Sequence, residues 1–282
     1  MGTGETPMSN ATVGAVLGEG VRAVVHELRG ADGVDRAVKR NRPATPDQWL
    51  VEEHACLVAA LASGAPGPAG PSLAEVEGRL GLVTALAAGP TMWSVLVDEP
   101  DRAAELGRQL AEVQQALFAL DPSFALPRQV DRLEAKLRAA GHRHDLDVAP
   151  LLDFVRDAAA DDRLGICHGD LHPHNVVLTD DGPVLVDWFD ACAGGLVAEV
   201  ARTSVLITSA EDPFRRPGPE TVAALARLHD AYLAAALEHL GAAGTGDAAT
   251  LARWMVVQRA ARLAEGLASS DVDEVRRGLA AW

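Results

Sequence analysis

Several kinds of residue are scarce in this chain, and each scarcity excludes a class of protein. Cysteine occurs three times in 282 residues, as Cys56, Cys167 and Cys192, which is too few and too scattered for a disulfide framework or a Cys-x-x-Cys metal knuckle. No apolar run reaches about 18 residues, so no membrane-spanning helix is expected. The first residues are polar and lack the apolar core of a signal peptide. We therefore expect a cytoplasmic protein without a membrane partner.

Basic charge is also scarce. The formal net charge is −15, which argues against nucleic acid as a partner because its phosphates would be repelled. Residues 88–282 carry most of the excess, with 18 basic and 30 acidic residues. Such acidity can attract a cationic ligand, although solubility alone would also account for it. The acidic residues considered for this role are Glu211, Asp212, Glu220, Asp230 and the cluster at 271–274.

Lysine is nearly absent, since 23 of the 25 basic residues are arginine. The lysine ammonium is a compact charge on a flexible side chain, whereas the arginine guanidinium is a rigid planar group, so the two are not interchangeable in a binding site. The two lysines, Lys39 and Lys136, are therefore of interest individually.

The pattern of turns and apolar residues predicts two parts, residues 1–87 and residues 88–282. Glycine turns between short apolar runs are typical of strands in the first part. In the second part Leu106, Leu110 and Val113 illustrate a helical spacing. The predicted strands cover 13–17, 23–28, 36–39, 72–76 and 80–86, with one helix over 47–61. The later helices are predicted over 101–120, 130–140, 149–160, 220–240 and 250–267.

The segment from His168 to Asp187 carries the clearest chemistry. Asp170 lies on a polar loop, and Asn175 follows five residues later at the start of a predicted hairpin. An antiparallel hairpin joins its two ends, so we expect Asn175 and Asp187 to be neighbours. Amide and carboxylate oxygens suit Mg²⁺ bound to phosphates, and Asp170 would then accept a proton from a hydroxyl group, as in phosphoryl transfer.

A zinc site is the rival interpretation of the same loop. His168, Asp170, His172 and His174 are residue types that bind zinc. This interpretation gives no role to the amide and carboxylate at the ends of the hairpin.

The N-terminal part offers a matching nucleotide site. Gly18 and Gly20 form a glycine turn whose backbone N–H groups can approach phosphates. The ammonium of Lys39 at the end of a strand would contact the α- and β-phosphates. Glu53 on the following helix is the expected partner of Lys39, with Glu52 as the adjacent alternative.

These motifs resemble the aminoglycoside phosphotransferase family within the protein-kinase-like superfamily. The resemblance implies an α+β, two-lobed protein-kinase-like fold that uses ATP (or GTP) and Mg²⁺. It implies that Asp170 is the catalytic base and that Asn175 and Asp187 bind Mg²⁺. It also implies that a linker near Thr84 and Leu86 meets the nucleotide base. The residues that carry the resemblance are His168–Asn175, Val186–Ala191, Ala201–Thr203, the glycine turn and Lys39.

The sequence departs from the family pattern after this motif. The stretch after Gly194 lacks the usual Gly-Asp-Pro, and Glu199 stands where family members often carry aspartate. The contact that this aspartate makes must therefore be made differently.

The leading hypothesis is an ATP-dependent O-phosphotransferase acting on a small, cationic acceptor. Within the family this points to an antibiotic, an aminoglycoside or a basic peptide, and to resistance. The alternatives are a metabolic kinase for a sugar or amino alcohol, and a nucleotide-binding pseudokinase that acts as a regulator. The terminal carboxylate of Trp282 is a further candidate for reaching the acceptor pocket.

Overall fold

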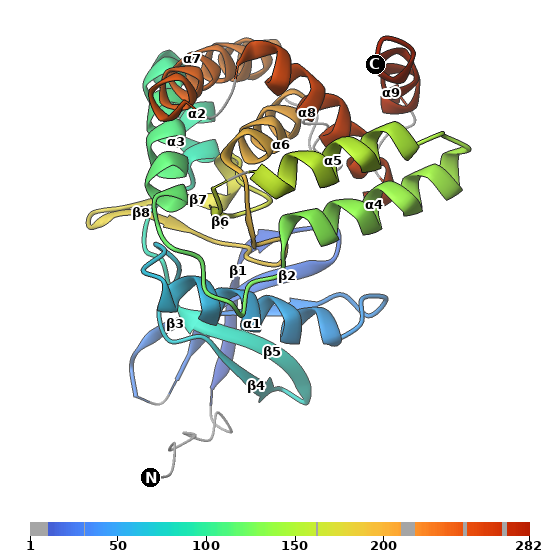
Figure 1. The fold of residues 1–282 in the computed structure, drawn as a ribbon. Coiled ribbons are helices and arrows are strands. Elements are labelled where there is room, and N and C mark those ends of the chain that lie inside the picture. The colour runs from blue at the N-terminus through green and yellow to red at the C-terminus, as the bar shows by residue number, and fades with distance from the viewer. Residues whose placement is uncertain (1–10, 31, 162, 210–217, 245–246, 267–269) are drawn as a thin grey trace.

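The N-terminal part of the molecule is an antiparallel sheet covered by one helix (Figure 1). The computed structural model describes residues 11–282 except 31, 162, 210–217, 245–246 and 267–269. The five strands follow the order β1-β2-β3-β5-β4, and helix α1 contacts β3, β4 and β5. Their bounds are β1 Thr12–Glu19, β2 Ala23–Arg29, β3 Asp35–Asn41, α1 Gln48–Ala62, β4 Ser72–Val76 and β5 Arg79–Ala85.

The larger C-terminal part is mainly helical and lies on the other side of α1 (Figure 1). Its longest helix, α7, packs most extensively on α3. This close approach depends on Gly107, because a Cβ there would overlap the carbonyl oxygen of Leu228. The bounds are α2 Met92–Asp98, α3 Ala103–Phe118, α4 Gln129–His144, α5 Ala149–Asp161, α6 Leu196–Thr208, α7 Pro219–Ala243, α8 Ala248–Arg262 and α9 Ser270–Ala280.

Two short two-stranded sheets position the residues of the candidate site. Strand β6 (Gly165–Cys167) pairs with β9 (Cys192–Gly194), and β7 (Val176–Thr179) pairs with β8 (Gly182–Leu185). The loop that holds Asp170 runs from β6 to β7 and ends in a 3-10 turn, Pro173–Asn175. Both ends of this loop are therefore fixed by sheet hydrogen bonds.

The hydrophobic core joins α1 to the helical part. The sheet has its own small cluster of Leu28, Val38, Val76 and Val83. Helix α1 instead contributes Cys56 and Leu57, among others, to the large core that the C-terminal helices form. Movement of α1 relative to the helical part would therefore expose apolar surface.

The structure confirms the predicted α+β, kinase-like fold class. Strand β1 extends to Glu19, two residues past the predicted end, and α8 ends at Arg262, before the predicted 267. Helices α2, α6 and α9 were not predicted. Helix α2 has only seven residues, and residues 196–207 of α6 are all buried, so α6 lacks the solvent-exposed polar face that marks an amphipathic helix. The predicted division between residues 87 and 88 lies between β5 and α2 and stays a prediction as a domain boundary. Among the described residues, none of the helices combines the length and apolar character that crossing a bilayer requires.

Candidate active site

His168 fixes the start of the loop that carries Asp170. Its side chain is fully buried, its Nε2 lies 3.1 Å from the carbonyl oxygen of Val186, and its ring lies 4.8 Å from that of Trp188. Burial lowers the pKa of His168, so the ring is neutral and Nε2 donates to the carbonyl. This bond ties the loop to the return strand of the hairpin.

The next residue, Gly169, is held on both sides by α6. Its amide donates to Glu199 Oε1 over 2.9 Å, and its carbonyl accepts from Arg202 Nε over 2.9 Å. Gly169 has φ +74°, and a Cβ at this position would overlap the carbonyl oxygen of Asp190. Only glycine fits there. Glu199 thus holds the loop that carries Asp170, at the position where the family that the sequence resembles often has aspartate.

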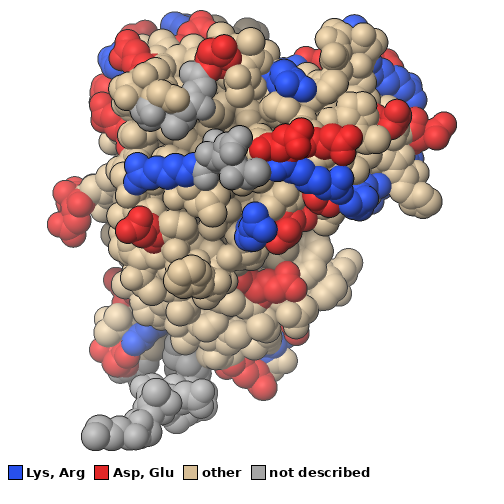
Figure 2. Space-filling view, viewed as in Figure 1, with Lys and Arg blue, Asp and Glu red and all other residues tan. Residues whose placement is uncertain are grey.

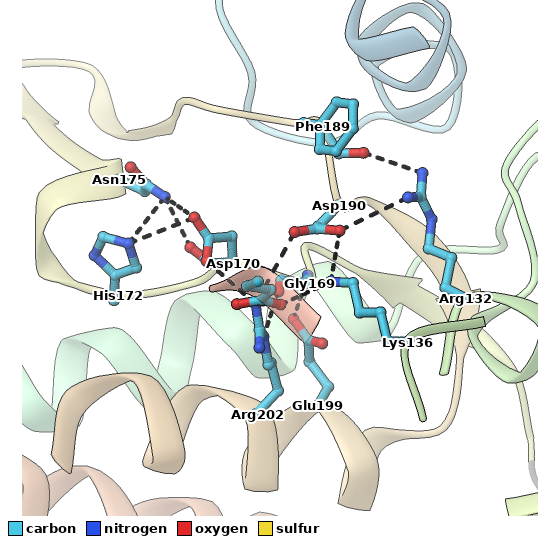
Figure 3. A network of polar contacts seen from close by, with 11 residues as sticks. Arg132, Lys136, Gly169, Asp170, His172, Asn175, Phe189, Asp190, Glu199 and Arg202 are labelled. Atoms are coloured by element: carbon cyan, nitrogen blue, oxygen red, sulfur yellow. Dashed lines mark hydrogen bonds and ion pairs between the residues drawn. The ribbon is translucent and has the colours of Figure 1, made fainter. Parts of the chain in front are cut away.

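Asp170 lies at the centre of the site (Figure 3). Its Oδ2 accepts from Asn175 Nδ2 over 3.1 Å and lies 3.5 Å from His172 Nε2, while its Oδ1 lies 3.7 Å from Arg202 Nη2. Burial alone would raise the pKa of Asp170, but His172 and Arg202 outweigh it and hold the pKa well below its usual range. The side chain keeps 27% of its surface exposed. An ionised, reachable carboxylate of this kind can accept a hydrogen bond from a hydroxyl group.

The hairpin brings Asn175 and Asp187 together, as the sequence predicts. The amide of Val186 donates to the carbonyl of Asn175 over 3.0 Å, and Asp187 follows directly. Asn175 Nδ2 is engaged by Asp170, so Oδ1 is the atom left for a cation. Asp187 has φ +66°, a left-handed conformation that is uncommon outside glycine and is typical of functional positions. Two hard oxygen donors of this kind fit Mg²⁺, which completes its coordination with phosphate and water.

Lys39 connects this hairpin to the N-terminal sheet. Its Nζ lies 2.8 Å from Asp187 Oδ1 and 2.7 Å from Glu53 Oε2. Burial alone would lower the pKa of Lys39, but Asp187 and Glu53 outweigh it and raise the pKa above its usual value. Of the two glutamates considered, Glu53 is buried against Lys39, whereas Glu52 is exposed. The ammonium is therefore held between the two parts of the molecule.

The glycine turn differs from the prediction at one residue. Gly18 is part of β1, opposite Val25, because the strand continues to Glu19. The turn itself begins at Gly20, whose amide donates to the carbonyl of Ala23 over 2.9 Å. A phosphate-binding role for Gly18 and Gly20 stays a prediction.

The two linker residues lie at the end of the sheet. Thr84 is buried in β5 opposite Ala37. The amide of Leu86 donates to the carbonyl of Asp35 over 3.3 Å, so this N–H is already engaged. A contact of Thr84 and Leu86 with a nucleotide base stays a prediction.

The zinc interpretation finds no support in the geometry. No three His, Cys, Asp or Glu side chains gather as a metal site in the part of the chain that the structure describes. His168 is turned to the Val186 carbonyl, and the ring of His174 stacks on Trp93 at 4.3 Å.

An ion-pair network beside Asp170 was not predicted. Lys136 Nζ lies 2.9 Å from Asp190 Oδ1 and 2.9 Å from Glu265 Oε1, and Arg202 Nη2 also lies 2.9 Å from Glu265 Oε1. The partners come from α4, α6, the segment after Asp187 and the turn after α8, so no sequence spacing connects them. The rarity of lysine was the only signal that could have pointed to Lys136.

A cavity of about 30 Å³ lies beside this network. Glu199 and Arg202 are among the residues that line it, and Glu199 Oε2 and Arg202 Nη1 have no hydrogen-bond partner among the described residues. Its size and polar lining suit an ordered water.

Trp282 and two of the acidic residues, Glu211 and Asp212, were also considered as candidates for binding the acceptor. The ring of Trp282 lies 5.3 Å from that of Phe154 on α5, and the C-terminal end lies far from β7 and β8 (Figure 1). Glu211 and Asp212 lie outside the described residues. Acidic and basic side chains are interspersed over the face drawn in Figure 2.

Comparisons with known proteins agree with this geometry. The model of the APH phosphotransferase enzyme family matches residues 15–221. An aminoglycoside-3'-phosphotransferase of type VIII has a TM-score of 0.56 and 23% identity, covering 92% of this chain and 96% of that one. A choline kinase from Cryptosporidium parvum has a TM-score of 0.54 and 11% identity, covering 97% and 90%.

A third similar structure is an amicoumacin kinase in complex with AMP-PNP and Ca²⁺, with a TM-score of 0.55, 12% identity and coverage of 94% and 86%. A search of curated proteins found no match. At these identities the three structures establish the kinase-like fold. The family model extends over far more than half of the sequence, and this chain therefore belongs to the APH phosphotransferase enzyme family.

Proposed function

We propose that this phosphotransferase transfers the γ-phosphoryl group of ATP to a hydroxyl group of a small molecule, with Mg²⁺ as the metal. One observation carries the proposal. Lys39 forms ion pairs with both Glu53 and Asp187, and the β7–β8 hairpin places Asp187 beside Asn175, which donates a hydrogen bond to Asp170. A cation held by Glu53, two oxygen donors for a metal and an ionised carboxylate are the parts that phosphoryl transfer requires.

Each residue has a separate task in this mechanism. Lys39 would bind the α- and β-phosphates, and Glu53 would hold its ammonium in place. Asn175 Oδ1 and Asp187 would hold Mg²⁺, which when bound neutralises charge on the phosphates. Asp170 would accept the proton of the acceptor hydroxyl as its oxygen bonds to the γ-phosphorus and the bond to the β,γ-bridging oxygen breaks, which releases ADP. Positioning and electrostatics supply most of the rate in such a reaction.

The choice of ATP and Mg²⁺ rests on the site and on one similar structure. The amicoumacin kinase was solved with an adenine nucleotide analogue and a divalent cation. GTP is the alternative nucleotide. A cytoplasmic location and the absence of a nucleic acid partner stay predictions from the sequence.

A cationic antibiotic is our first proposal for the acceptor. Its support is the acidity of residues 88–282 and the names of two similar structures, an aminoglycoside phosphotransferase and an amicoumacin kinase. The carboxylates of Asp190 and Glu265, which share Arg202 with Asp170, are already paired with Lys136 and Arg202. A cation would therefore compete with these internal partners or use other carboxylates.

A metabolic kinase for a sugar or amino alcohol is the second candidate. The similarity to a choline kinase favours an amino alcohol. The pairing of Asp190 and Glu265 with Lys136 and Arg202 favours a sugar, because a neutral acceptor needs no free carboxylates.

The test is ADP release from ATP and Mg²⁺ with a panel of acceptors. The panel holds aminoglycosides, basic peptide antibiotics, sugars, choline and ethanolamine, with an acetylated aminoglycoside as the matched uncharged control. Turnover with a cationic antibiotic and not with its acetylated form supports the first candidate. Turnover with sugars or amino alcohols alone supports the second, and ATP binding without any turnover would support the pseudokinase.

A further inference from the structure

One face of α1 lies along the segment that carries Asp187. Trp49, Glu53 and Cys56 are spaced four and three residues apart and therefore share a helix face. The Trp49 ring stacks on Phe189 with centroids 5.1 Å apart and planes 25° apart. Glu53 reaches Asp187 through Lys39, and Cys56 Sγ lies 3.8 Å from the carbonyl oxygen of Ala191.

Two cationic side chains contact the two ends of this stack, one beside Trp49 and one beside Phe189. The Arg22 guanidinium, in the turn between β1 and β2, lies 4.6 Å from the centroid of the Trp49 ring. Arg132 on α4 lies 6.0 Å from the centroid of Phe189 and donates to the Phe189 carbonyl over 3.0 Å. A continuous row of contacts thus runs from the glycine turn through Trp49 and Phe189 to the helical part.

The stack is not needed to fill the hydrophobic core. Trp49 and Phe189 are both only partly buried, and neither is a member of the two core clusters. Asp187, two residues before Phe189, has a left-handed backbone conformation. Such a conformation is unfavourable for aspartate and persists only where packing around it holds the backbone in place. Glu53 lies one helical turn after Trp49, so a shift of Trp49 along or around the helix axis also moves Glu53.

We propose that Trp49 and Phe189 are positioning residues that hold Glu53 and Asp187 in the geometry that binds the metal–nucleotide complex. The stack fixes the helix that carries Glu53 against the segment that carries Asp187, and Lys39 can bridge both only while the two are in register. Arg22 connects the glycine turn to the same stack. This inference rests on the proposed function, because it gives Lys39 and Asp187 their nucleotide and metal roles.

The test measures binding of AMP-PNP by calorimetry at several Mg²⁺ concentrations, for wild type, Trp49→Leu, Trp49→Phe, Phe189→Leu and the double variant Trp49→Leu/Phe189→Leu. An aromatic pair contributes enough for Trp49→Leu to weaken AMP-PNP binding about three- to ten-fold and to raise the Mg²⁺ concentration for half-maximal binding. Trp49→Phe should restore wild-type affinity, since it keeps a stacked ring. The double variant should lose no more than the larger single loss, because both substitutions remove one contact.

Trp282→Leu is the matched control. It removes another partly buried tryptophan, whose ring meets that of Phe154 edge to face, away from Asp187, and should leave AMP-PNP binding unchanged. Thermal unfolding of each variant checks that the fold is intact, and Phe189→Leu carries the test if Trp49→Leu fails to fold.

Three results would overturn the positioning role: wild-type affinity in Trp49→Leu, a loss in Trp49→Phe as large as in Trp49→Leu, or additive losses in the double variant. A wild-type chain that does not bind AMP-PNP at all would instead overturn the proposed function, and this inference with it.

Discussion

At the scale of single residues, the site keeps buried side chains ionised. Burial by itself favours the neutral form of Lys39 and Asp170, and neighbouring groups of opposite charge reverse this. Lys39 is kept charged by two carboxylates, and Asp170 is kept ionised by His172 and Arg202. Glu199 is different, because burial raises its pKa to about 7. The three groups make distinct predictions.

Replacing Lys39 by methionine should weaken the use of ATP. The substitution keeps the length of the side chain but removes the ammonium that we assign to the phosphates, and it leaves Glu53 and Asp187 without their shared partner. We expect kcat/KM for ATP to fall by about 10²-fold or more. Steady-state kinetics at varied ATP concentration measures it.

Lys136→Met is the control for Lys39→Met, since Lys136 also bridges two carboxylates. It should leave the KM for ATP near that of wild type. Equal losses in both variants would contradict a nucleotide role specific to Lys39.

Glu199→Gln should change how stability depends on pH. The pKa of Glu199 is raised from 4.5 to about 7 in the folded protein, so the folded state binds its proton more tightly than the unfolded state does. This stabilising contribution is full below pH ~4.5 and is lost as the pH rises through ~7, by at most ~3 kcal/mol.

The comparison is thermal unfolding of wild type and Glu199→Gln at pH 5 and pH 8. The stability of the variant relative to wild type should be greater at pH 8 than at pH 5. A difference between the two proteins that does not vary with pH would show that Glu199 does not titrate in this way.

At the scale of elements, the hairpin β7–β8 and helix α6 do most of the positioning. The hairpin joins Asn175 to Asp187 through its ends, and α6 holds both backbone groups of Gly169. The hairpin was predictable because a turn and two apolar runs lie close together in sequence. Helix α6 was not, since residues 196–207 are all buried and its polar residues Glu199, Arg202 and Thr203 contact the protein interior rather than solvent.

The packing of α3 on α7 makes a prediction at this scale. Gly107→Ala should destabilise the protein by about 1–3 kcal/mol, because the added methyl overlaps the carbonyl oxygen of Leu228. Gly241→Ala in α7 is the matched control: nothing lies within 4 Å of its Cβ position, and alanine should stabilise the helix by up to about 1 kcal/mol. Urea unfolding measures both, and a neutral Gly107→Ala would contradict the close approach of the two helices.

The surroundings of Asp170 combine contacts within one short motif with contacts between distant segments. Asp170, Asn175 and Asp187 form one local motif, so the sequence predicted their neighbourhood. Lys136 and Glu265, by contrast, meet across 129 positions, and Trp49 and Phe189 meet between the two parts of the molecule. Such contacts depend on how the elements pack, which the sequence pattern does not encode locally.

At the scale of the whole molecule, a small sheet is followed by a larger helical part (Figure 1), and Lys39 connects the two through Glu53 and Asp187. Lys39 and Glu53 come from the first part, and Asp170, Asn175 and Asp187 come from the second. Helix α1 packs in the core of the second part, so the two halves of the site are coupled through it. In the proposed mechanism this assembled site transfers a phosphoryl group, and Asp170 acts in the chemical step rather than in nucleotide binding.

The decisive experiment for this role of Asp170 compares wild type with Asp170→Asn in two assays. One is calorimetric binding of AMP-PNP with Mg²⁺, and the other is transfer of the labelled γ-phosphoryl group of ATP to an acceptor identified by ADP release. We predict that Asp170→Asn binds AMP-PNP like wild type, while transfer falls by about 10²- to 10⁴-fold, because the amide cannot accept the hydroxyl proton. Transfer by Asp170→Asn at the wild-type rate would contradict the assignment of Asp170 and the account built on it.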